Sequence, residues 1–168
     1  MAAEDILKYL NLFVDGRGHA GKIEEYSPPD LTVSTEEFRG GGMDAPIDLD
    51  MGQEKMTTSF VLTSYDRDVL SLWGIKDGSV VQLTARGSLE SLDGTKTAVA
   101  HHMQGKIISV ARGTWGSGAK PSLTFTVSLR YYREVHGGVD INEIDVVNMV
   151  RKVRGVDQLA EHRANIGL

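Results

Sequence analysis

Histidines, paired carboxylates and glycine-rich loops are the features of this chain whose residue types could support catalysis or ligand binding. His101 and His102 are adjacent in a predicted strand, so their side chains point to opposite faces and cannot chelate one metal ion together. Asp48 and Asp50 share a strand face about 7 Å apart, and such a pair of carboxylates could suggest acid–base catalysis of the glycosidase kind. The strand that carries them is polar, and nothing in it indicates a raised carboxyl pKa of the kind that acid–base catalysis needs.

Two glycine-rich stretches lack the residues that nucleotide-binding loops require. In Gly113–Lys120 (GTWGSGAK), Gly118 is followed by alanine rather than by lysine and a hydroxyl residue, and no helical pattern follows. Gly40–Gly42 is followed by alanine at position 45, and the helix that the dinucleotide pattern requires is absent. The chain also lacks the Gly-x-Ser-x-Gly elbow of a serine nucleophile. We therefore predict that the protein is not an enzyme and has no cofactor or metal site.

The elements that carry these residues are β-strands, and the longest covers residues 122–136. Apolar side chains alternate there with hydroxyl-bearing ones, which is the pattern of a strand with one apolar and one polar face. At about 3.3 Å per residue the strand extends for about 50 Å, far beyond a typical globular strand. The residues expected on its apolar face are Leu123, Phe125, Val127, Leu129 and Tyr131.

Two more strands, expected over residues 80–91 and 97–110, repeat this alternation, and we predict that the polar faces line a water-filled channel. A barrel of about eight strands from one chain has room only for side chains or a small ligand. Strands shared among several subunits would enclose a wider channel and leave no sheet edge exposed. The predicted lumen residues are Gln82, Thr84, Arg86, Ser88, Glu90, His102, Gln104, Thr124, Thr126 and Ser128.

The remaining pattern predicts a single, mainly β domain over residues 1–168, a sandwich or barrel of eight to ten strands. A strand over residues 10–14 enters a tight turn at Asp15-Gly16, and residues 21–26 are expected to return as the second arm of that hairpin. A short helix is expected over residues 66–73, and a second begins from a cap at Asp157. The domain also includes an N-terminal hairpin (about 9–28), a loop (about 38–58) and a C-terminal segment (about 145–168).

Composition restricts the classes of function that remain. A chain of 168 residues suits one domain, and its net charge of -5 argues against a basic nucleic-acid-binding surface. The sequence contains no cysteine, which excludes disulfides and thiolate metal sites. Its acidic start does not resemble a signal peptide, and no apolar run is long enough for a membrane helix. The lack of cysteine suits a protein that assembles in the cytosol.

Several stretches together resemble the major tail tube protein of contractile-tailed bacteriophages and the related contractile bacteriocins. They occur in the same order and include both ends of the chain, whereas residues 53–121 match in pattern rather than in residues. The stretches are YLNLFVDG (9–16), EFRGGGMDAP (37–46), IDLDMG (47–52), the Tyr131-Tyr132 strand end, EID (143–145), NMV (148–150), GVDQL (155–159), Arg163 and NIGL (165–168).

This resemblance implies a β-sandwich subunit that forms hexameric rings, stacked into the inner tube of a contractile tail in the virion. It implies as partners other copies of the chain, the tail sheath protein, the tape-measure protein, and the baseplate and tail terminator proteins. Genomic DNA would pass through the lumen without specific binding. In the family, the loop after the third strand and the chain ends contact neighbouring subunits and rings. Here that role would fall on Phe38, Gly40, Gly41, Gly42, Met43, Asp44, Asn165 and Leu168.

Three alternatives stay open at this point. The tube could belong to a bacteriocin or a secretion-type injection system, which share the fold with phage tails. A β-barrel that binds a small ligand is a different class, and it predicts a stable monomer with an apolar interior row. An enzyme is the third class, and the chain offers no catalytic constellation for it.

Overall fold

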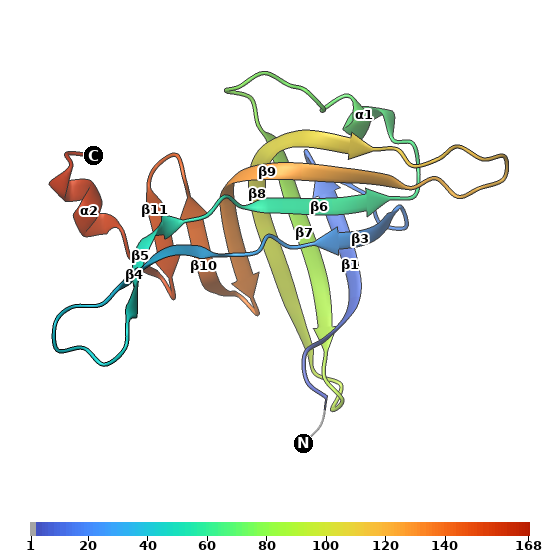
Figure 1. Cartoon of the computed structure of the whole chain (residues 1–168). Coiled ribbons are helices and arrows are strands. Elements are labelled where there is room, and N and C mark those ends of the chain that lie inside the picture. The colour runs from blue at the N-terminus through green and yellow to red at the C-terminus, as the bar shows by residue number, and fades with distance from the viewer. Residues whose placement is uncertain (1–2) are drawn as a thin grey trace.

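The computed structural model describes residues 3–168, and β-strands make up most of it (Figure 1). The chain has more strands than the eight to ten expected, because several are very short. The elements are β1 (Ile6–Val14), β2 (Arg17–Gly18), β3 (Ile23–Ser27), β4 (Val33–Phe38), β5 (Ile47–Gln53), β6 (Thr57–Leu62), α1 (Arg67–Leu70), β7 (Val81–Glu90), β8 (Lys96–Ala111), β9 (Leu123–His136), β10 (Val139–Asp145), β11 (Val150–Val153), β12 (Val156–Asp157) and α2 (Ala160–Asn165).

The long strands β8 and β9 bend and take part in two layers (Figure 1). β9 pairs with β6 along its first half and with β10 along its second half, while β8 runs beside it throughout. We call β3, β6 and the adjoining halves of β8 and β9 the front layer. The back layer consists of β1, β7, β10 and the other halves of β8 and β9. Strands of the two layers cross steeply in Figure 1, as in an orthogonal β-sandwich.

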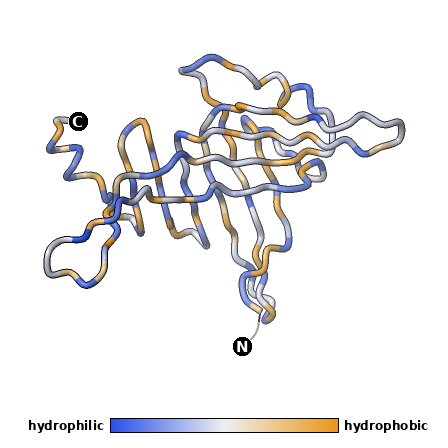
Figure 2. The backbone as a smooth tube through the Cα atoms, viewed as in Figure 1, coloured by the Kyte–Doolittle hydropathy of each residue, from blue (hydrophilic) through white to orange (hydrophobic). Residues whose placement is uncertain are grey.

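The hydrophobic core lies between the two layers. Phe60 and Phe125 stack there with their ring centroids 4.9 Å apart, and both are almost completely buried. Leu12, Leu83 and Met103 approach from the back layer and are no more than 2% exposed. Figure 2 shows how short hydrophobic and hydrophilic stretches alternate along the chain. This alternation lets each layer bury one face and leave the other in water, so apolar burial stabilises the fold.

A β-bulge at Arg130 changes the expected apolar row of β9. Leu129 and Tyr131 face consecutive residues of β8, which leaves Arg130 as an extra residue in the ladder. One extra residue reverses the alternation of side chains, so Tyr132 is only 2% exposed while Tyr131 lies on the outer face. The prediction that Tyr131 continues the apolar row is therefore wrong.

The N-terminal hairpin is shorter than expected. Asp15 and Gly16 form the predicted tight turn, with φ angles of 48° and 81°. The return arm is the two-residue β2, whereas β3 pairs with β6 in the other layer, with Tyr26 opposite Phe60. Residues 21–26 are thus a strand, as predicted, but their expected pairing within the hairpin is wrong.

The two short helices are present near the predicted positions. The side chain of Asp66 caps α1 by accepting hydrogen bonds from the Asp68 and Val69 amides, and Val69 is buried in the core. The C-terminal helix α2 follows Leu159 rather than starting at Asp157. Asp157 instead accepts a hydrogen bond from the Leu159 amide and pairs with Arg163 at 2.6 Å, which fixes α2 to the strand before it.

Candidate assembly surfaces

The outer face of the back layer is a continuous polar surface built from five strands. Cross-strand pairing places Thr84 opposite His102, His102 opposite Arg133, and Arg133 opposite Glu143. Directly opposed residues on one face are close enough for their side chains to interact. None of the predicted lumen residues on this face is buried; they are Gln82, Thr84, Arg86, Ser88, Glu90, His102 and Gln104.

Charges of both signs compensate one another on this surface. Arg133 donates hydrogen bonds of 3.1 and 2.9 Å to Asp140, and these bonds raise the pKa of Arg133. Partial burial, together with the positive charges of Arg133 and Arg86, lowers the pKa of His102, which favours its neutral form. The Arg86 guanidinium lies 5.5 Å from the ring centroid of Phe13. The surface therefore stays hydrated without presenting a continuous cationic track.

Thr124, Thr126 and Ser128 lie on a different surface from the other predicted lumen residues. They project from the outer face of the front layer, where Thr126 and Ser128 stand opposite Ser59 and Thr57 of β6. The layers pack through their inner faces, so their outer faces point away from each other. The single polar row expected from the sequence is thus divided in two by the bend in β8 and β9.

The back layer ends in a strand with a largely unpaired edge. β7 pairs along one side of β1, but within the described residues the other side pairs only at Phe13 and Val14, with β2. Ile6, Leu7 and Tyr9 are 48%, 53% and 77% exposed. An unpaired edge that also carries apolar side chains is a template for pairing with another chain.

A second surface that needs a partner is the hairpin formed by β4 and β5. It is a separate two-stranded sheet that projects from the sandwich (Figure 1). Phe38 stands opposite Ile47, and Leu49 lies on the same face. Phe38 is 50% exposed, Ile47 51% and Leu49 42%. An isolated two-stranded hairpin is at best marginally stable in water. We therefore expect another molecule to cover this apolar face.

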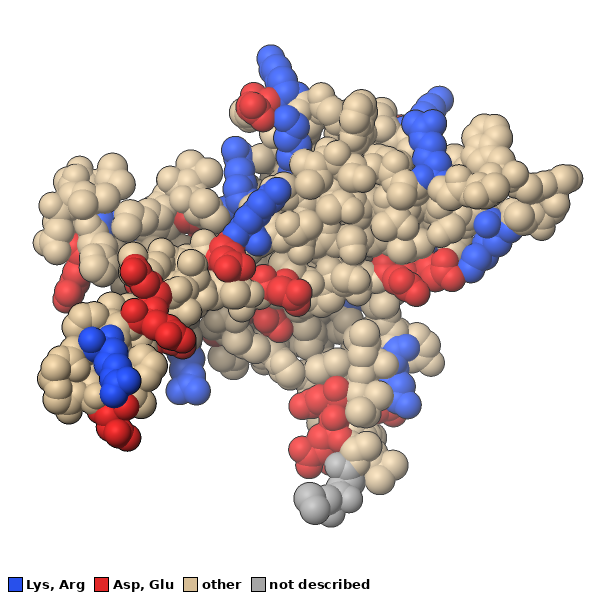
Figure 3. Space-filling model, viewed as in Figure 1, with Lys and Arg blue, Asp and Glu red and all other residues tan. Residues whose placement is uncertain are grey.

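This hairpin is strongly acidic, and its net charge is as large as that of the full chain. We call residues 32–54, closed by the hydrogen bond from the Glu54 amide to the Thr32 carbonyl, the acidic hairpin. It contains six carboxylates and one arginine, a net charge of -5 that equals that of the full sequence. Figure 3 shows acidic side chains over this part of the molecule. Arg151 of β11 donates a 2.7 Å hydrogen bond to Asp50, which lowers the pKa of the Asp50 carboxyl and ties the hairpin to the C-terminal region.

The predicted contact residues gather at one end of the molecule. Met43 folds back over the hairpin tip, where its sulfur accepts from the Gly40 amide and its carbonyl accepts from Arg39. Both α2 and the acidic hairpin lie on the left of Figure 1, and a hollow of about 580 Å³ is lined by residues of both regions. Most of the predicted contact residues are exposed, and Gly40 and Met43 are half-buried; the set is Phe38, Gly40, Gly41, Gly42, Met43, Asp44, Asn165 and Leu168.

Sequence reasoning missed part of the polar surface. Asn11 and Phe13 of β1 belong to it, because they stand opposite Arg86 and Thr84. Their period-two alternation with buried Leu12 and Val14 was a usable signal. Other missed members lie beyond the Arg130 bulge, where the alternation changes phase and no sequence signal marks the change; they are Tyr131, Arg133 and Glu143.

The two adjacent histidines do face opposite sides of the sheet, as predicted. His101 points inward, where its ring contacts the Tyr26 hydroxyl at 2.9 Å and the Glu134 carboxylate at 3.4 Å. Burial lowers the pKa of His101, although Glu134 opposes the change. Within residues 3–168 no group of three or more potential ligands could hold a metal ion, and no helix is long and apolar enough to cross a membrane.

Comparison with known proteins gives a consistent assignment. Residues 4–167 match the family described as phage tail tube protein FII. The chain is 32% identical over 172 residues to the tail tube protein of Escherichia phage P2, and the alignment covers 100% of both chains. It is 28% identical over 157 residues to the major tail tube protein of Serratia phage KSP20, covering 92% of this chain and 91% of that protein. Among solved structures, a chain of the anti-feeding prophage baseplate covers 75% of this chain and 90% of its own length, with a TM-score of 0.48 and 11% identity. The family match spans both candidate assembly surfaces, and the chain belongs to the phage tail tube protein FII family.

Proposed function

We propose that this protein polymerises as stacked hexameric rings into the inner tube of a contractile phage tail, which conducts DNA. The observation that carries the proposal is that the large sheet has, at each of its two ends, a surface that lacks a partner within the subunit. The free edge of β1 lies at one end, and the acidic hairpin lies beside β11 at the other. A lone subunit leaves both exposed to water, whereas neighbours in a ring cover both. Family membership supports the same conclusion.

The outer face of the back layer is the surface best suited to line the lumen. Barrels of about 16–18 strands already enclose an aqueous channel, and the five strands of this surface, repeated in six copies, exceed that number. Compensated charges on this face would let a polyanion slide past without a continuous basic track to hold it. We assign Gln82, Thr84, Arg86, Ser88, Glu90, His102 and Gln104 to the lumen, and place Thr124, Thr126 and Ser128 outside it.

The remaining partners follow from this arrangement. The tape-measure protein and then genomic DNA would occupy the lumen, the tail sheath protein would surround the outer wall, and baseplate and tail terminator proteins would meet the two ends. Assembly would take place in the host cytoplasm, and the mature protein would reside in the virion. A tube of a bacteriocin or secretion-type system would use the same surfaces without transporting a genome.

A small-ligand barrel receives no support from this geometry. The described sheet is open, with β2 and β12 at its two ends, so it does not enclose a cavity. The space between the layers is filled by core side chains such as Phe60 and Phe125.

Cysteine labelling of assembled tubes tests the lumen assignment. The chain has no cysteine, so Ser88→Cys and Thr126→Cys each introduce a single reactive site, and Leu83→Cys serves as a buried control. We expect a small maleimide to label the first two positions in tubes, and a bead-bound maleimide to reach only Thr126→Cys. If the bead-bound reagent labels Ser88→Cys in intact tubes, the assignment is wrong.

A further inference from the structure

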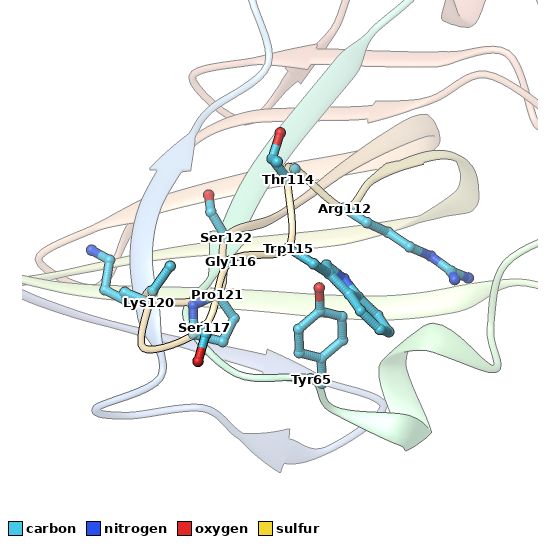
Figure 4. A pocket seen from close by; sticks show the side chains of 11 residues that line it. Tyr65, Arg112, Thr114, Trp115, Gly116, Ser117, Lys120, Pro121 and Ser122 are labelled. Carbon is cyan, nitrogen blue, oxygen red and sulfur yellow. The ribbon is translucent and has the colours of Figure 1, made fainter.

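A patch of exposed aromatic side chains lies at the end of the molecule opposite the acidic hairpin. Both tryptophans of the chain are in it, and Trp73 and Trp115 are 58% and 78% exposed. Tyr65 meets Trp115 edge to face with ring centroids 5.8 Å apart. Figure 4 shows these two side chains next to each other. Trp73 donates a 3.2 Å hydrogen bond to the carbonyl of Ile108, which holds its ring against the edge of β8. The aromatic patch is defined as Tyr65, Trp73, Ile108, Arg112 and Trp115.

Arg112 connects two hollows in the aromatic patch. One hollow, of about 590 Å³, lies between Tyr65 and the 112–122 loop, and the other, of about 350 Å³, lies beside Trp73. Arg112 lines both hollows and Lys120 lines the larger one, whereas no carboxylate lines either of them. Lys120 pairs with Glu24 at 2.6 Å, whereas Arg112 has no carboxylate at salt-bridge distance within residues 3–168. Tryptophan, tyrosine and arginine are the residue types that dominate the binding energy of protein interfaces.

We propose that the aromatic patch receives the acidic hairpin of a second copy of this chain. The hairpin offers what the patch lacks, namely a net charge of -5 and an exposed apolar face with Phe38, Ile47 and Leu49. Its apolar face would cover the tryptophan rings, and Glu36, which stands opposite Leu49 on that same face, would approach Arg112. Such complementarity of charge around an apolar centre favours one orientation over others.

The positions of the two surfaces make this contact intermolecular. The acidic hairpin and the 112–122 loop project from opposite ends of the molecule in Figure 1, and the Arg151–Asp50 ion pair of 2.7 Å fixes the hairpin at its own end. A contact that joins two different surfaces at opposite ends of the subunit is heterologous. When each copy makes this contact with the next, the copies form a closed ring or an open filament. The inference therefore rests on the proposed tube and names the surface on each copy that joins it to the next.

Charge exchange tests the contact in the full chain. We expect Arg112→Glu to raise the critical concentration for tube assembly by about tenfold or more, because it brings like charges together. Adding Glu36→Lys to the same chain should recover a substantial part of that loss, because Glu36 is exposed on the apolar face of the hairpin. Lys76→Glu reverses an exposed charge outside the patch and should leave assembly unchanged. Normal assembly of Arg112→Glu, no recovery in the double variant, or an equal defect in Lys76→Glu would each overturn the proposal.

Cross-linking gives an independent measurement that does not disturb the patch. Ser117→Cys in the loop and Glu36→Cys on the apolar face of the hairpin are both at exposed positions, and the chain has no other cysteine. In tubes of the double variant, a short bis-maleimide should produce a ladder of linked copies, and each single variant should remain unlinked. Tubes without a ladder would refute this contact and leave the tube itself standing. A wild-type protein that forms no tubes would instead refute the proposed function.

Discussion

Gly105→Ala is the substitution that most sharply tests how β8 and β9 bend. A Cβ atom at Gly105 would lie 2.3 Å from the carbonyl oxygen of Ser128 and 3.1 Å from the Cα of Leu129. Both neighbours are backbone atoms next to the Arg130 bulge, so no side chain can rotate away to make room. Relief requires β9 to move by about 1 Å within a close-packed core.

The expected cost follows from that displacement. Overpacking of this kind costs about 3 kcal/mol, at the upper end of the usual range. Replacing glycine by alanine also lowers the conformational entropy of the unfolded chain, which stabilises the folded state by about 0.5–1 kcal/mol. The free energy of unfolding should therefore fall by about 2 kcal/mol, which lowers the urea midpoint by about 1 M if the slope is about 2 kcal/mol/M.

The assay is urea unfolding of the unassembled subunit, followed by circular dichroism. Gly41→Ala is the matched control, because a Cβ there meets nothing within 4 Å and its φ is not in the left-handed region. We expect Gly41→Ala to change stability by less than about 0.5 kcal/mol, as surface substitutions usually do. Equal midpoints for the two variants would refute the close contact between β8 and β9 on which the bend depends.

Three further predictions concern assembly, the core and acid stability. Gly41→Trp should abolish tubes in electron micrographs while the subunit keeps its urea midpoint; normal tubes would contradict a contact at the hairpin tip. Tyr132→Ala should destabilise the subunit by about 3–5 kcal/mol, and Tyr131→Ala by less than about 1 kcal/mol, because the bulge buries only the first; equal losses would contradict the bulge. Burial lowers the pKa of His19 below its ordinary value of 6.5 in the folded state, so the unfolded state binds protons more readily. Stability should therefore be complete above about pH 6.5 and fall as the pH drops below that value; His19→Gln should flatten this part of the pH profile, and an unchanged slope would exclude His19 as the cause.

Most of the strand pattern could be read from the sequence, because a face buried on a core forces side chains to alternate. The rows through Leu83 and Phe125 followed this rule and proved to be buried. The row through Tyr131 did not, since a bulge depends on how two distant strands fit together and leaves no local mark. The pairing of β3 with β6 rather than with β1 is another tertiary choice that local turn chemistry does not decide.

The candidate surfaces divide in the same way. The exposed glycines and apolar residues of the hairpin could be found in the sequence, as could the polar rows of β7 and β8. The separation of Thr126 from Thr84 could not, because it arises from the bend that places one strand in two layers. The aromatic patch was also missed, since Trp73 and Trp115 are far apart in the chain and only the fold brings α1 beside the 112–122 loop.

A cryo-electron microscopy reconstruction of the polymer formed by the purified protein is the most direct test. We expect a hollow tube whose channel is lined by the outer face of the back layer, with Thr84 and Arg86 facing the channel and each β1 edge covered by a neighbouring copy. Separate monomers at high concentration, or a tube in which that polar face is turned outward, would contradict the proposal that this face lines the channel of a tube.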